Sequence, residues 1–169
     1  TFSTPTPVTT LSQEQMQARA AGSMVELLQD LPAVRPGNNN TSSTNIGAAT
    51  FDMRSLGSIR TLTMIDGRRM MDSNAAVSPI FDVNLIPVGL IKSMEIVTAG
   101  ASSVYGSDAV TGVVNILMDS NLEGLKLDAQ IGDSQEGDAR NGALDIAYGR
   151  QFAGGRGHAV VAGSFFSRP

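Results

Sequence analysis

The stretch NLIPVGLIKSMEIVTAGASSVYGSDAVTGVVNI (84–116) decides the fold. The proline in IPVGL can open a helical turn, which we predict over residues 87–91. Short apolar runs separated by glycine-containing breaks predict strands over 94–98 and 113–117, with a second helical turn over 101–105 between them. Brief strands that alternate with single helical turns indicate a small mixed unit of the α+β class.

Two blocks upstream extend this unit. FDMRSLGS (51–58) predicts a short strand at its start, and RTLTMIDGRRM (60–70) predicts a strand that ends at Asp66 and Gly67. Asp-Gly is a strong turn signal after such a run. Residues 33–50 have no hydrophobic period and are rich in Asn, Ser, Thr and Gly, so they are predicted to form a long loop.

The N-terminal part contains two capping boxes, in which a serine is followed three residues later by Gln or Glu. The pairs are Ser12 with Gln15 and Ser23 with Glu26. They predict helices over 13–20 and 24–31, preceded by an extended lead-in over 1–11. The second helix ends before the proline at position 32.

The pattern changes after about residue 120. Apolar and polar residues alternate with a period of two over 124–131 and 143–148, and 158–166 is a third, more apolar candidate strand. This period is typical of a half-buried strand, and equally of a barrel wall with lipid on one side and water on the other. One connection, 132–142, is long and acidic, and the other, 152–157, is short.

Composition limits the chemistry. The chain has 169 residues, a net charge of −4, no cysteine and a single histidine, His158. Without a cluster of Lys and Arg, nucleic acid is not an expected partner. A lone histidine supplies neither a metal site nor a triad, so we predict no metal, no cofactor, no catalytic residues and no enzymatic activity.

Blocks 51–58, 60–70 and 84–116, taken in order, resemble the plug domain of TonB-dependent outer-membrane receptors. The resemblance implies an α+β plug domain, a small mixed sheet with short helices, over residues 1–119. It further implies that residues 120–169 are antiparallel β-strands of an incomplete transmembrane β-barrel of about 22 strands.

The resemblance also implies a function, which is energy-coupled uptake of a scarce nutrient such as a siderophore, cobalamin or a carbohydrate. The expected place is the cell outer membrane, with the plug inside the barrel lumen and accessible from the periplasm. The expected partners are the inner-membrane protein TonB, the small-molecule nutrient and outer-membrane lipid. A fragment of this length is not expected to transport alone.

Candidate site residues follow from the same resemblance. The outward loops of the plug would contact the ligand through Asn38, Asn39, Asn40, Met71 and Ser73. Two arginines, Arg54 and Arg68, would pair with glutamates of the barrel. Architectural roles are expected for Gly57, Asp66, Gly67, Tyr105, Gly106, Gly112 and Asn115. Tyr105 is expected to bury its ring. Thr98 stands where many relatives have an arginine, which places one plug–barrel ion pair in doubt.

Blander interpretations stay open at these positions. The asparagines can belong to a solvated connector, and the arginines can be ordinary surface residues. The competing hypothesis for the whole chain is a self-contained periplasmic binding or signalling module with an α+β core. The two hypotheses differ at residues 120–169, because a soluble module must bury the apolar side of these strands whereas a barrel fragment leaves it exposed.

Overall fold

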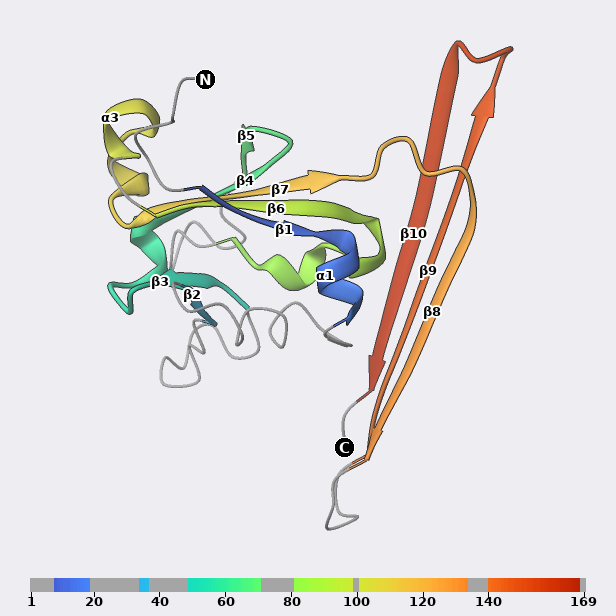
Figure 1. Ribbon diagram of the computed structural model, residues 1–169, viewed down its shortest axis with the longest axis horizontal. Helices are drawn as coiled ribbons and strands as arrows, with labels where there is room; N and C mark the ends of the chain where they lie inside the picture. The colour runs from blue at the N-terminus through green and yellow to red at the C-terminus, as the bar shows by residue number, and fades with distance from the viewer. Residues whose placement is uncertain are drawn as a thin grey trace.

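Two β-sheets organise the computed structural model, which describes residues 8–18, 34–36, 49–70, 81–98, 101–133 and 140–167. Figure 1 shows a mixed sheet with short helices around it and, beside it, a long upright ribbon of three strands. A short pair of strands, β2 with β3, lies below the mixed sheet in this view.

The mixed sheet has five strands in the order β1-β6-β7-β4-β5. Every neighbouring pair is antiparallel except β4 with β7, which is parallel. The strands are β1 (Val8–Ser12), β4 (Thr61–Ile65), β5 (Arg68–Arg69), β6 (Ile91–Val97) and β7 (Gly112–Met118). The central strand β7 buries four of its seven residues, as its apolar sequence requires.

Short elements connect these strands and cover the sheet. The strand pair outside the sheet is β2 (Val34–Pro36) and β3 (Phe51–Met53). The helical elements are α1 (Gln13–Ala18), η1 (Ser58–Arg60), η2 (Val83–Leu85), η3 (Val88–Leu90), α3 (Ser102–Tyr105) and η4 (Ser107–Ala109). Among the described residues, none of these helices has the length and the apolar run needed to cross a membrane.

The mixed sheet has apolar contacts on both faces, because successive side chains of a strand point to opposite sides. The larger cluster joins β6 and β7 to α1, β3 and η2. Its most buried members are Phe51, Met53, Val83, Ile91, Met94, Ile96, Val114 and Ile116. The smaller cluster, on the other face, places β4 against α3 and η4, and contains Leu62, Met64, Ala101, Ala109 and Val113.

The second sheet is a purely antiparallel ribbon in the order β10-β9-β8. Its strands are β8 (Gly124–Asp133), β9 (Arg140–Phe152) and β10 (Gly157–Ser167). The register aligns one row of apolar side chains across it, which we call the apolar face. Its members are Leu125, Leu127, Ala129, Ile131, Leu144, Ile146, Tyr148, Val161 and Phe165. All of them are exposed to solvent.

Most predicted elements are confirmed, with changes at their ends. The first capping box is present: the Ser12 amide donates to Gln15 Oε1 at 3.0 Å, and the Gln15 amide donates to Ser12 Oγ at 3.4 Å. The strand expected over 94–98 begins three residues earlier, at Ile91, directly after the η3 turn. The strand expected over 143–148 extends to Arg140 and Phe152.

Besides the two-residue β5 that follows the Asp-Gly turn, two strands were not predicted. β1 lies in the extended lead-in and pairs with β6, and β2 lies in the segment interpreted as a loop and pairs with β3. Both are short pieces whose partners are distant in sequence, so no local pattern marks them. The second predicted helix, 24–31, lies outside the described residues.

Candidate functional site

Three of the residues expected to be architectural meet at the turn after β4. The Gly67 amide donates to Asn115 Oδ1 at 2.9 Å, and Asn115 Nδ2 donates to Glu95 Oε2 at 3.1 Å. Asp66 has a positive φ of 48° and accepts the Met118 amide at 2.9 Å. Aspartate tolerates this conformation better than most residues. The side chains thus join the β4–β5 turn to β6 and to the end of β7.

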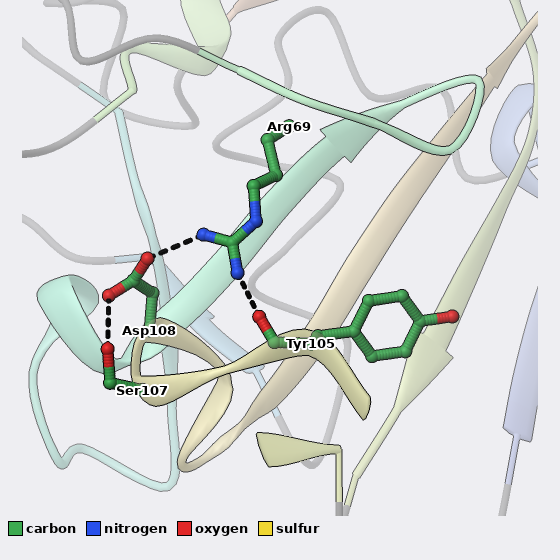
Figure 2. Close-up of polar contacts among 4 residues, drawn as sticks. All are labelled: Arg69, Tyr105, Ser107 and Asp108. Atoms are coloured by element: carbon green, nitrogen blue, oxygen red, sulfur yellow. Dashed lines mark hydrogen bonds and ion pairs between the residues drawn. The ribbon is translucent and has the colours of Figure 1, made fainter. Parts of the chain in front are cut away.

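A second polar group forms where the side chain of Arg69, in β5, contacts the α3–η4 segment (Figure 2). Its Nη1 donates to Asp108 Oδ2 at 2.6 Å, and its Nη2 donates to the carbonyl oxygen of Tyr105. Ser107 Oγ donates to the other oxygen of the same aspartate at 3.1 Å. The hydrogen bonds from Arg69 and then Ser107 hold the pKa of the Asp108 carboxyl below its ordinary value.

Tyr105 therefore contributes through its backbone. Figure 2 shows its carbonyl directed at Arg69 while the ring points away from the guanidinium. The side chain is 38% exposed, so the expected burial of the ring is not seen in this chain. Gly106 follows, with a positive φ of 89°, and a Cβ there would lie 3.3 Å from Arg69 Nη2.

A chain of buried hydroxyl groups fixes the start of β4 and β7. The Met53 amide donates to Thr61 Oγ1 at 3.2 Å, and Thr111 Oγ1 donates to the Arg60 carbonyl oxygen at 2.8 Å. The two hydroxyls lie 2.9 Å apart. Since the hydrogen of Thr111 is used on the carbonyl, Thr61 is the donor between them. The hydroxyl groups of Thr61 and Thr111 thereby both have hydrogen-bond partners.

Gly112 lies where β7 closely approaches the backbone of β6 and the side chain of Met53. A Cβ at this position would be 2.3 Å from the Val97 carbonyl oxygen and 2.7 Å from Met53 Sδ, and its φ is 150°. Only glycine fits such an approach without displacement of the β6 backbone. Gly57 lies in the turn before η1, where its amide donates to Asp52 Oδ1 at 2.9 Å.

The two arginines expected to pair with a barrel are exposed. Arg54 follows β3 with a positive φ of 58°, and Arg68 lies in β5 at the edge of the sheet. Inside the described part of the chain, a carboxylate pairs instead with Arg69, the residue after Arg68. The expected ligand contacts are Asn38, Asn39, Asn40, Met71 and Ser73, and they lie outside the described residues.

Sequence reasoning did not single out Arg69 and Asp108, nor the threonine pair. Arg69 is the second arginine of DGRR and Asp108 is the aspartate of YGSD, so both lie in the blocks that carry the resemblance. No local sequence pattern shows that the two side chains meet. Asp82 was also missed. It caps η2 by accepting the amides of Ala49 and Asn84, each at 3.0 Å, and so joins β3 to the segment before β6. Within the described ranges, no three His, Cys, Asp or Glu side chains gather as a metal site.

The two sheets meet at η3. All three strands of the second sheet contact this turn, and Lys126 Nζ donates to the Gly89 carbonyl oxygen at 3.3 Å. The Asp119 amide, just after β7, donates to the Leu90 carbonyl oxygen at 2.8 Å. The contact lies on the face of β8–β10 opposite the apolar face, so the exposed apolar residues point away from the mixed sheet.

Comparison with known proteins gives the same architecture. Over 98% of this chain, the fold matches the ferric enterobactin receptor PfeA of Pseudomonas aeruginosa with a TM-score of 0.73 and 17% identity, covering 25% of that protein. The siderophore receptor PirA of the same organism matches over 99% of the chain and 29% of its own, with a TM-score of 0.68 and 19% identity. The mixed sheet with short helices followed by antiparallel strands is thus the fold of this part of such receptors.

Sequence comparison points the same way. The vitamin B12 transporter BtuB of Vibrio vulnificus is 27% identical over 113 residues, which is 67% of this chain and 18% of that protein. The chain therefore spans only a small part of the relatives that it matches. The family model of the TonB-dependent receptor plug domain matches residues 1–113. The chain belongs to the family of TonB-dependent receptor plug domains.

Proposed function

We propose that residues 1–119 form the plug and residues 120–169 the first wall strands of an outer-membrane receptor that takes up a scarce nutrient. Energy would come from TonB at the inner membrane, and the plug would occupy the barrel lumen, accessible from the periplasm. On this proposal the chain is a binding and gating element without enzymatic activity. By itself it would not transport, because three strands cannot enclose a channel.

The exposed apolar face of β8–β10 carries this proposal. Ile131 is 91% exposed, Val161 71% and Leu125 69%, although each belongs to a regular strand. A contiguous apolar surface of this kind marks an interaction site rather than a free surface. Lipid against this face and the mixed sheet against the other is the arrangement that a plugged barrel requires.

The competing hypothesis of a self-contained periplasmic module explains this face poorly. Such a module would turn Leu125, Ile131 and their neighbours inward, whereas here they point away from the mixed sheet. The open strand edges of β8 and β10 would also be left without partners in the described part of the chain.

The functions of the similar proteins suggest the nutrient class. BtuB is a vitamin B12 transporter and PfeA a ferric enterobactin receptor, so cobalamin and ferric siderophores are the first candidates, with carbohydrate as a third. We propose Asn38, Asn39, Asn40, Met71 and Ser73 as ligand contacts. We also propose Arg54 and Arg68, both exposed, as partners of barrel carboxylates.

A growth assay tests the transport function. Cells that lack their own receptors and express the full-length receptor containing this chain are grown with cyanocobalamin, or with ferric enterobactin under iron limitation. Growth that depends on both the receptor and TonB supports the proposal. Accumulation of the receptor in the outer membrane without uptake of either compound contradicts these two nutrient assignments.

A pair of substitutions tests the lipid-facing surface in the same receptor. Leu127→Arg places a charge on the apolar face, which costs about 2–4 kcal/mol near the middle of a bilayer. Ser164→Arg, which adds the same charge on the opposite face of β10 one register step away, is the matched control. We expect the first variant to lower the amount of receptor in the outer membrane several-fold and the second to leave it unchanged. Equal amounts would contradict the lipid-facing assignment.

A further inference from the structure

The single turn η3 is the place where the mixed sheet docks on the strands beside it. β8, β9 and β10 all contact η3, although it is only three residues long. Ala147, in the middle of β9 on this face, is 1% exposed, so the contact excludes water at its centre. The docking surface is therefore small and closely packed.

The contact is built on the peptide groups of Gly89. Lys126 of β8 donates to its carbonyl oxygen at 3.3 Å, and Asp145 of β9 lies against the same residue. A Cβ at position 89 would lie 3.6 Å from the Cβ of Asp145, which is ordinary van der Waals contact. Side chains from two neighbouring strands thus contact the glycine of this turn.

The segments around η3 fix it in the mixed sheet. Ile91, the next residue and the start of β6, is 0% exposed, and the Leu90 carbonyl accepts the Asp119 amide from the end of β7. η3 is therefore joined to both central strands as well as to the second sheet. A shift of η3 away from β8 and β9 would have to move β6 and β7 as well, or break the contacts of η3 with them.

We propose that η3 is the fixed attachment point of the plug, clamped at Gly89 by Lys126 and Asp145, and that it stays docked while a nutrient passes. This inference rests on the proposed transport function. It assigns the plug a stationary end at η3, so that any opening must come from elements distant from this turn.

Disulfide trapping tests the docking geometry without transport. The Gly89→Cys and Asp145→Cys double variant of this chain, folded in mild detergent, places two Cβ atoms at a separation near the 3.5–4.5 Å of a disulfide. The matched control, Gly89→Cys with Gln151→Cys, uses the same face of β9 about 20 Å further along. We expect most of the first variant and little of the second to cross-link on mild oxidation. Equal cross-linking, or none in either, overturns the clamp.

The same cross-link tests whether η3 moves. In the full-length receptor, uptake of cyanocobalamin or ferric enterobactin, whichever the wild type takes up, is measured before and after reduction of the disulfide, with each single-cysteine variant as control. The expected result is uptake within twofold of the single variants in both states. Loss of uptake on oxidation with recovery on reduction overturns the stationary attachment. Absence of uptake by the wild type would instead contradict the transport function alone.

Discussion

The mixed sheet buries apolar side chains on both of its faces, whereas the three-stranded sheet exposes them on one. Both are regular sheets of the same chain, so the difference lies in what covers each face. Helices and turns cover the mixed sheet. One side of β8–β10 meets η3 and, at Gly149, also Leu122, whereas the apolar residues of the other side are exposed. On the proposed function, lipid would cover the exposed side of β8–β10.

Two phenylalanines give the largest expected contrast. Phe51 in β3 is 2% exposed and Phe165 in β10 is 67% exposed. Phe51→Ala should lower the free energy of unfolding by about 3–5 kcal/mol, because it opens a cavity in the core. Phe165→Ala should change it by less than about 0.5 kcal/mol. Urea unfolding of the two variants in aqueous buffer measures the difference, and equal losses would mean that the apolar face is covered in solution.

Two glycines give the next contrast. Gly112→Ala forces a methyl group against the Val97 carbonyl at a positive φ, whereas Gly142→Ala in β9 meets nothing within 4 Å. We expect a loss of about 2–4 kcal/mol for the first. The second should have almost no effect. Thermal unfolding of both variants checks this, and a well-folded Gly112→Ala variant with unchanged melting would show that β6 can move aside.

Loss of one hydroxyl group from the buried Thr61–Thr111 pair should lower the free energy of unfolding noticeably. Thr111→Val removes the side-chain donor to the Arg60 carbonyl, which still accepts the Thr111 amide, and leaves the Thr61 hydroxyl without its acceptor, so we expect a loss of about 1–3 kcal/mol. Thr63→Val, at a half-buried position of β4, is the matched control and should cost less than about 0.5 kcal/mol. Equilibrium unfolding in urea compares them. Equal effects would remove the argument for a hydroxyl chain.

The exposed ion pair gives the smallest effect and depends on pH. The Asp108 pKa is lowered in the folded state, so the pair stabilises the fold above the ordinary aspartate pKa and loses this contribution as the pH falls through the folded value. Asp108→Asn should cost less than about 1 kcal/mol at pH 7, since both side chains are about half exposed. The difference from wild type should shrink as the pH falls below the ordinary aspartate range, and also in high salt. A difference that does not change with pH or salt would point to a structural rather than an ionic role.

The sequence predicted local features better than long-range ones. The capping box at Ser12, the turn at Asp66 and the one-turn elements η3 and α3 each have a signal within a few residues, and the structure contains them. Strands β1 and β2 have no such signal, because only their pairing with β6 and β3 makes them strands. The period-two pattern after residue 124 fixed the faces of β8–β10 but left open which medium each face meets.

In the candidate site, too, single residues could be predicted from the sequence but their long-range contacts could not. Gly67 and Asn115 could be selected as motif residues, yet their hydrogen bond joins segments 48 residues apart. Arg69 was passed over beside Arg68, because only the fold shows which of two adjacent arginines faces Asp108. Adjacent strand residues point to opposite sides, so a shift of one position changes the whole environment of a side chain.

The brevity of the connection between the sheets has a final consequence. β7 ends at Met118 and β8 begins at Gly124, so the chain between them spans at most about 20 Å. A tether this short keeps η3 and its binding surface at a local concentration in the millimolar range or above. One lysine hydrogen bond and a small packed patch can then suffice for near-complete occupancy, although the same contact between separate molecules would hardly form.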